Sequence, residues 1–153
     1  MAEPQPVPIS ASEWRYRLRR VERIARALGF VGRVEYRHVI SGSGGGQFGT
    51  DPNFHDDLLV VDAQAFLRDA DPGDFSLEAI IAHERGHQLL FRRPVLRRMM
   101  DKGISGVSEE IIASLLGSLI VEKEADRHAL HGKALHDAVK HGMDPNRAAQ
   151  RIL

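Results

Sequence analysis

Two histidines and a glutamate stand at a spacing that suits metal chemistry. They belong to the run His83-Glu84-Arg85-Gly86-His87, an H-E-x-x-H pattern in a segment that we predict to be helical. Residues four apart on a helix lie about 40° apart around its axis and roughly 6 Å along it, so both imidazoles can reach one metal ion. Glu84 is placed to take a proton from a water molecule at that metal. The pattern therefore predicts a metal site with Glu84 as its general base.

A catalytic zinc ion takes three protein ligands and keeps one position open, so a second element must supply the third ligand. The run Glu122-Lys123-Glu124-Ala125-Asp126 places two acids four residues apart on a second predicted helix. We expect Glu122 to be the third ligand, and Asp126 to accept a hydrogen bond from the outer nitrogen of one zinc-binding imidazole. Taken alone, this acidic pair is also typical of a solvated patch on a helix.

The composition limits the alternatives. The chain has 153 residues, of which 42% are apolar and 27% charged, as in an ordinary globular protein. Lys and Arg together number 21, as do Asp and Glu, so the formal net charge is zero. The chain therefore has no excess of positive charge that would indicate a nucleic acid partner. The chain has no cysteine, which excludes disulfides and thiolate zinc sites and leaves histidines and carboxylates as the strong metal ligands.

The N-terminal residues and the apolar runs of the chain indicate where in the cell it is expected. The N-terminus has neither the basic nor the apolar region of a secretory signal. The longest nearly apolar run, Ile111–Val121, is too short to span a bilayer. We therefore expect a cytoplasmic protein without a transmembrane segment, made of a flexible tail over 1–9 and a single domain over 10–153.

The first half of the chain predicts one helix and two strands. Ser10 and Glu13 have the spacing of a capping box, and apolar residues recur at helical spacing until Gly29. The opposite face of this helix is rich in arginine, which is typical of a solvated face or of a stripe that binds phosphate or a membrane surface. Strands are predicted over 33–40 and 58–62, and the glycine-rich segment 41–57 between them is expected to lack regular structure, being either disordered or functional.

The second half is predicted to be helical. One helix covers 77–91, carries the H-E-x-x-H pattern and ends before Pro94. A long helix is expected over 108–141, with soft points at Gly117 and Gly132 and with Glu109 and Glu110 placed to favour its dipole. A short helix is expected over 145–152. The predicted fold is α+β and helix-dominated, with a small sheet and with the metal between the helix that carries the histidines and a second, long helix.

The two motifs together resemble the gluzincin zinc metallopeptidases, whose signature is H-E-x-x-H followed by E-x-x-x-D. The sequence EADRHAL and the ending HGMDPNRAAQRIL are similar to the group that holds the CAAX prenyl proteases and HtpX. The ImmA/IrrE-like peptidases are the nearest alternative within the clan, but the D-P-x-x-A ending favours the first group. Prenyl proteases and HtpX are membrane proteins, and this chain has no spanning segment, so a prenylated or membrane substrate is not carried over.

This resemblance implies a zincin-like core with one Zn²⁺ per chain, which hydrolyses peptide bonds of a protein or peptide substrate. Strand 58–62 stands where the family has its substrate-edge strand, so a substrate would pair with it or with the glycine-rich stretch before it. The alternative is a zinc-containing peptidase fold that binds a partner and cuts little or nothing. The sequence does not predict the oligomeric state. It also leaves several candidates for the group that stabilises the oxyanion: Arg92, Arg93, Arg127, His128, His131 and His136.

Overall fold

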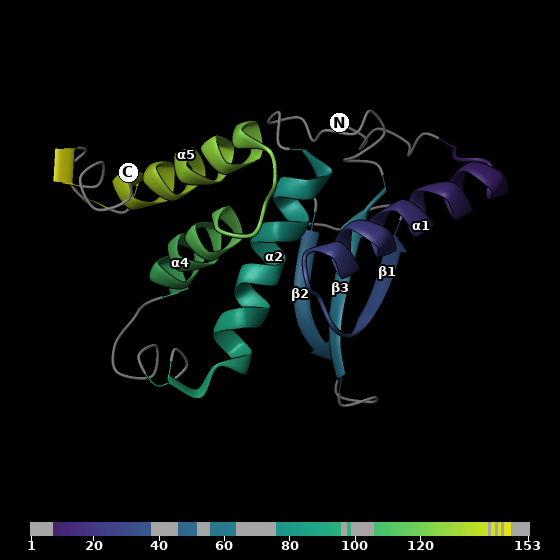
Figure 1. Ribbon diagram of the computed structural model, residues 1–153, viewed down its shortest axis with the longest axis horizontal. Coiled ribbons are helices and arrows are strands. Elements are labelled where there is room, and N and C mark those ends of the chain that lie inside the picture. Colours follow the sequence, from purple (N-terminus) through teal and green to yellow (C-terminus); the bar gives the residue numbers. More distant parts are fainter. Residues whose placement is uncertain are drawn as a thin grey trace, which may run out of the picture. The chain divides into compact units, whose positions relative to one another are not determined.

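A computed structural model describes most of the helices and strands (Figure 1). The described residues are 8–37, 46–51, 56–63, 76–95, 98, 106–140, 142, 144, 146 and 147, with the backbone alone at 46–51, 56 and 106–108. The chain divides into two compact units, residues 1–77 and 78–153. Their elements are α1 (Ala11–Ala27), β1 (Arg33–Arg37), β2 (Gly46–Asp51), β3 (Asp56–Asp62), α2 (Leu77–Arg92), α4 (Gly106–Ser118) and α5 (Glu124–Lys140). The described part is thus helix-dominated α+β, as predicted.

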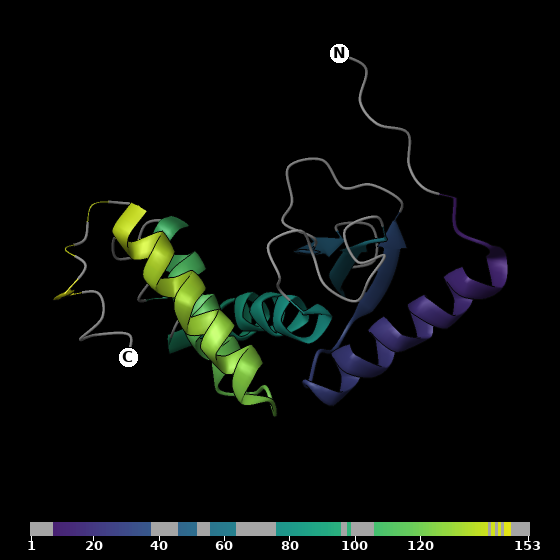
Figure 2. The same ribbon diagram turned by 90° about the horizontal axis from the view of Figure 1, so that it is seen from above.

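Helix α1 begins and ends where its sequence predicts. Ser10 is its N-cap, and the Ser10 hydroxyl accepts a hydrogen bond from the Glu13 backbone N–H at 3.2 Å. Gly29 follows the helix with φ of 85°, a conformation that favours glycine. On the buried side, the rings of Trp14 and Tyr36 lie 4.9 Å apart and join α1 to β1, which runs beside it in Figure 2. The arginine-rich face is largely exposed to solvent, since Arg15, Arg19 and Arg23 are all exposed.

The sheet of the first unit has the strand order β1-β3-β2. Strand β3 pairs in parallel with β1, with Val34 opposite Leu59, and in antiparallel with β2, with Phe48 opposite Leu59. Leu59, Val60 and Val61 are buried because β3 lies at the centre of the sheet.

Two predictions about this sheet are wrong. Segment 41–57, expected to lack regular structure, contains strand β2, because its glycines hide the alternation of apolar and polar residues that marks a strand. Segment 58–62 is not an edge strand, since β1 and β2 both pair with it. Of the two stretches considered for substrate pairing, the one at an edge of the described sheet is β2. The predicted positions 38–40 lie outside the described residues.

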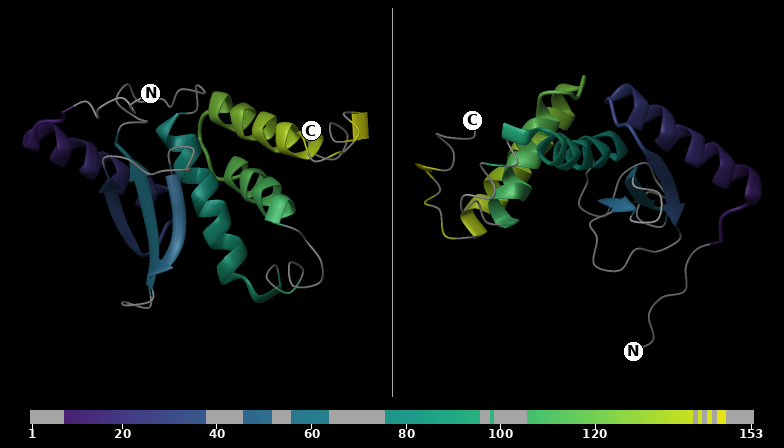
Figure 3. Two further views of the ribbon diagram at one scale, coloured as in Figure 1. Left: turned by 180° about the vertical axis from the view of Figure 1, so that it is seen from behind. Right: turned by 90° about the horizontal axis from the view of Figure 1, so that it is seen from below.

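The second unit contains α2, α4 and α5, and α4 and α5 lie side by side in Figure 3. Helix α2 confirms the predicted helix 77–91. The long helix expected over 108–141 is wrong as one element, because a turn over 119–123 separates α4 from α5. The Arg127 guanidinium donates to two backbone carbonyls, that of Ser118 at the end of α4 and that of Val121 in the turn, at 3.2 and 3.3 Å. It thereby joins α5 to the end of α4, where the last carbonyls have no helical partners.

Predictions for the two ends of the chain lie largely outside the described residues. This holds for the tail over 1–9, apart from residues 8 and 9, and for most of the helix over 145–152. At the start of that helix, Asp144 Oδ1 accepts hydrogen bonds from the backbone N–H groups of Asn146 and Arg147, as a helix N-cap does. Among the helices described, none combines the length and apolar character needed to cross a bilayer.

Helices α2 and α4 meet through two glycines. A Cβ atom on Gly86 would lie 2.1 Å from the backbone oxygen of Ala113, and one on Gly117 would lie 2.7 Å from that of Ala82. Both distances are far inside van der Waals contact, and the opposing atoms belong to helix backbone, which cannot swing aside. The two helices therefore approach each other at a distance that only glycine at these positions permits.

We expect Gly86→Ala to destabilise the protein, because the added methyl group must push α4 away from α2. The loss in free energy of unfolding should be about 2–3 kcal/mol or more, at the upper end for overpacking. The matched control is Gly132→Ala, on an exposed position of α5 where an added Cβ meets nothing within 4 Å. That change should stabilise by about 0.5–1 kcal/mol, since alanine restricts the unfolded chain. Urea unfolding followed by circular dichroism measures both, and a Gly86→Ala protein as stable as the wild type would contradict the contact.

Candidate metal centre

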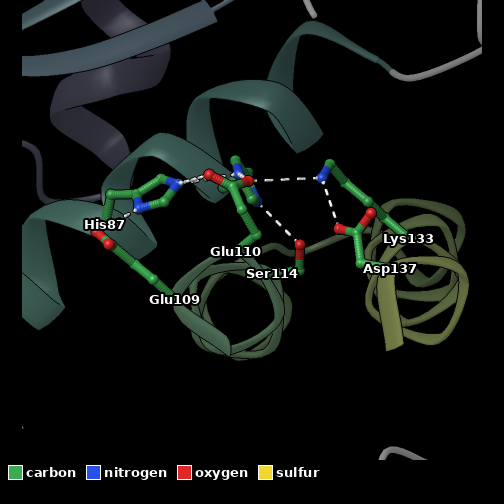
Figure 4. A network of polar contacts seen from close by, with 7 residues as sticks. His87, Glu109, Glu110, Ser114, Lys133 and Asp137 are labelled. Carbon is green, nitrogen blue, oxygen red and sulfur yellow. Dashed lines mark hydrogen bonds and ion pairs between the residues drawn. The ribbon is translucent and has the colours of Figure 1, made fainter. Parts of the chain in front are cut away.

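Three side chains bring their donor atoms to one point. The Nε2 atoms of His83 and His87 lie 3.2 Å apart, and Figure 4 shows His87 next to Glu110. Glu110 completes the group, with Oε2 at 3.0 Å from His83 Nε2 and Oε1 at 3.1 Å from His87 Nε2. Among the residues that the structure describes, these three form the group of possible metal ligands, with all ligand atoms within 4.8 Å of one another.

The outer nitrogens of both imidazoles have partners of their own. His83 Nδ1 lies 2.9 Å from Ser114 Oγ, and His87 Nδ1 lies 3.2 Å from Glu109 Oε1. A carboxylate only accepts hydrogen bonds, so His87 carries a proton on Nδ1 and, when neutral, has a lone pair on Nε2. Partners on the outer nitrogen are what orients metal-binding histidines in proteins, because they fix the tautomer and the ring.

The local sequence explains why these groups meet. His83 and His87 stand one turn apart on α2, and their rings are 4.8 Å apart in an edge-to-face arrangement. Glu110 and Ser114 likewise stand one turn apart on α4, so they share a face of that helix. The close approach at Gly86 brings this face of α4 to the histidines.

The donor set fits a small divalent metal ion. Two imidazole nitrogens and one carboxylate oxygen are a known ligand set of catalytic zinc, with bonds of about 2.0–2.2 Å. In a tetrahedral site with such bonds, neighbouring ligand atoms lie about 3.3 Å apart. The two Nε2 atoms are 3.2 Å apart, and each lies 3.0–3.1 Å from one of the two Glu110 oxygens, so a small movement of the Glu110 carboxylate suffices to enclose an ion.

The group is buried on one side and open on the other. The His83 and His87 side chains are 5% and 12% exposed, whereas that of Glu110 is 46% exposed. Ala79–Ala82, ahead of the histidines on α2, are buried. Such a site combines an apolar wall, which strengthens electrostatic interactions, with access for a ligand from the side of Glu110.

Without a metal, the charges of the group are coupled. Hydrogen bonds with His83 and His87 hold the pKa of Glu110 well below its usual range, although burial acts in the opposite direction. Burial lowers the pKa of His87, but the carboxylates of Glu110, Glu84 and Glu109 outweigh it and raise this pKa above 6.5. In the metal-free protein, the carboxylates of Glu109 and Glu110 thus favour the protonated form of His87, and a metal ion would take the place of a proton on Nε2.

Glu84, the predicted general base, is buried beside this group. It follows His83 on α2 and is 8% exposed. Its negative charge acts on His87. A carboxylate in this place can accept a proton within the site.

The structure does not bring Glu122 to the histidines. Glu122 lies exposed in the turn between α4 and α5, and it does not belong to the described group of ligand atoms. Asp126 is buried in the first turn of α5, at 7% exposure. The outer nitrogens that Asp126 was expected to serve lie instead against Ser114 and Glu109.

The sequence motifs did not identify Glu109, Glu110 and Ser114 as residues of the site. For the two glutamates, their place near the start of a helix offered a local explanation. Acids in the first turn of a helix favour its dipole, and both glutamates fit that interpretation for a helix predicted to begin at residue 108. A signal was nevertheless present. Glu110, Ser114, Gly117 and Ser118 form a polar and small stripe at helical spacing on an otherwise apolar segment, which indicates a face turned toward a site or a closely packed neighbour.

The side chains considered for oxyanion stabilisation either make hydrogen bonds with other groups or are exposed. Arg127 donates to the carbonyls after α4, and His131 Nε2 lies 3.1 Å from Ser118 Oγ. His128, His136, Arg92 and Arg93 are exposed. Lys133 of α5, which was not among these candidates, does lie beside the group, with Nζ at 3.8 Å from Glu110 Oε2.

The pKa shifts predict how stability depends on pH in the metal-free protein. The folded pKa of His87 lies above 6.5, so its contribution is complete below pH 6.5 and is lost as the pH rises through the folded pKa. The folded pKa of Glu110 lies below 4.5, so its contribution is complete above pH 4.5 and is lost as the pH falls. With EDTA present to remove any metal, Glu110→Gln should therefore reduce the free energy of unfolding most between pH 4.5 and pH 6.5. Urea titrations across the pH range measure this, with exposed Glu122→Gln as control, and a pH-independent difference would contradict the coupling.

Comparison with known proteins adds no relative to this description. No family model, no curated protein and no solved structure matches the chain.

Proposed function

We propose that this chain is a zinc-dependent peptidase of the gluzincin type, with a zincin-like fold, in which His83, His87 and Glu110 hold the metal. The observation that carries the proposal is the convergence of two imidazole Nε2 atoms and a carboxylate within 3.0–3.2 Å, with both outer nitrogens already partnered. The H-E-x-x-H pattern of HERGH supports the same conclusion. The third ligand departs from the gluzincin signature, because Glu110 takes the place expected for Glu122 of EKEAD. The substrate would be a protein or a peptide.

The chemistry follows from the residues around this point. Bound zinc would act as a Lewis acid on the attacking water and on the scissile carbonyl. Glu84 accepts one proton of the water as its oxygen bonds to the carbonyl carbon, and then donates that proton to the amine as the carbon–nitrogen bond breaks. Ser114 and Glu109 keep the imidazole rings in place meanwhile.

Glu84 is the residue that favours hydrolysis over other metal chemistry. Two histidines and one carboxylate also bind iron(II) in oxygenases, so the donor set alone leaves the metal and the reaction open. An oxygenase has no need of a carboxylate beside its ligands, whereas water activation requires a base. Glu84 is buried and its charge acts on His87, which is the placement that such a base needs.

The first test concerns the ligands. We expect one zinc ion per wild-type chain, and an affinity lowered by more than about 100-fold in Glu110→Gln, because losing a ligand should exceed the effect of losing one of its partners. Glu122→Gln is the matched control, since Glu122 is the exposed residue that the sequence pattern favours as ligand. Elemental mass spectrometry and competition with a chromogenic chelator measure both. If Glu110→Gln binds zinc as the wild type does while Glu122→Gln binds none, the assignment of Glu110 is refuted. If the wild type binds no metal, the site itself is refuted.

The second test concerns the base. Glu84→Gln should bind zinc as the wild type does but hydrolyse casein roughly 10²–10⁴-fold more slowly, the usual contribution of general acid–base catalysis. Glu78→Gln, in the first turn of the same helix, should retain activity. If the wild type binds zinc and turns over no substrate, the alternative of a zinc-containing binding or regulatory module replaces the peptidase. Equal activity of Glu84→Gln and wild type would exclude Glu84 as the base.

A further inference from the structure

Lys133 extends from α5 toward Glu110. Its Nζ lies 3.1 Å from Asp137 Oδ2 and 3.8 Å from Glu110 Oε2 (Figure 4). The side chains of Lys133 and Asp137 are only 25% and 20% exposed. Asp137 accepts a hydrogen bond from the ammonium, while the distance to Glu110 is that of an ion pair without a hydrogen bond. The lysine is therefore held at a fixed place beside the metal centre.

The stability of α5 does not explain this pair. A lysine four residues before an aspartate is the less favourable orientation for an ion pair on a helix. Asp137 also lies in the last turn of α5, where a negative charge opposes the helix dipole. Two local preferences thus act against Asp137 at this position, which indicates that the pair serves something outside its own helix.

The two oxygens of Glu110 have different surroundings. Oε1 lies 3.1 Å from His87 Nε2. Oε2 lies between His83, at 3.0 Å from Nε2, and the Lys133 ammonium. The positive charge of Lys133 therefore acts most strongly on Oε2, so the two oxygens of the carboxylate are not equivalent.

This difference matters for a metal that must activate water. A catalytic zinc needs an open position beside its three protein ligands. A carboxylate that binds through both of its oxygens occupies that position, whereas one that binds through a single oxygen leaves it to water. A cation on the second oxygen favours the single-oxygen mode.

We propose that Lys133, held by Asp137, is a positioning residue that makes Glu110 bind the metal through one oxygen and so keeps one coordination position open. The proposal rests on the proposed function, because it needs a metal at His83, His87 and Glu110. It assigns Lys133 no contact with the substrate.

The test uses Co²⁺ in place of zinc, because four-coordinate Co²⁺ absorbs visible light much more strongly than Co²⁺ with more ligands. Wild type and Lys133→Arg, which keeps the charge, should give the strong absorption of a four-coordinate site. Lys133→Met keeps the aliphatic chain without the charge, and we expect its absorption to weaken as the freed oxygen joins the metal. Its Zn²⁺ affinity should also fall about tenfold, as for other partners of metal ligands. The control is Lys140→Met, exposed at the end of the same helix, which should match the wild type.

The outcomes separate this proposal from the metal site itself. If Lys133→Met has the wild-type Co²⁺ spectrum and Zn²⁺ affinity, the positioning role is refuted while the metal site stands. If the wild type takes up no Co²⁺ or Zn²⁺, both are refuted. Should Lys133→Met fail to fold, Asp137→Asn provides the same test, because it leaves the lysine charge but removes its holder. That variant should weaken the Co²⁺ absorption, and an unchanged spectrum would refute the proposal.

Discussion

The contact between the backbones of α2 and α4 determines the geometry of the candidate site. Gly86 and Gly117 each face a backbone oxygen of the other helix, at places where any side chain would overlap with it. The histidines stand on one helix and Glu110 on the other, and their donor atoms are 3.0–3.1 Å apart. Moving the helices apart by the width of a methyl group would break these contacts. Gly86 therefore has a part in the site although it offers no ligand atom.

Patterns within a single element could be read from the sequence. Helix α1 follows from the Ser10 cap, its apolar spacing and Gly29, all of which act within a few residues. The same holds for α2 and for the pairing of His83 with His87, because the distance between positions i and i+4 is a property of the helix itself. The strand that became β3 was visible as a short apolar run.

Features that depend on two elements were not visible. The turn between α4 and α5 falls within a segment whose sequence favours one long helix. Arg127 stabilises this turn, and its contacts form only once α5 has folded back. Strand β2 owes its existence to pairing with β3 rather than to its own glycine-rich sequence. The choice between Glu110 and Glu122 is of the same kind. Both follow the histidines on predicted helices, and only the way the helices pack decides which carboxylate meets them.

The separation of the ligands along the chain gives the metal a second role. His83 and Glu110 are 27 residues apart in sequence, so an ion bound to both would close a loop and cross-link α2 to α4. An ion that binds the folded chain but not the unfolded one adds about 2.7 kcal/mol to the free energy of unfolding when the free ion is at a hundred times its dissociation constant. The melting temperature of the second unit would then report the supply of metal, and a cell poor in that metal would hold less of the folded protein as well as less of the active one.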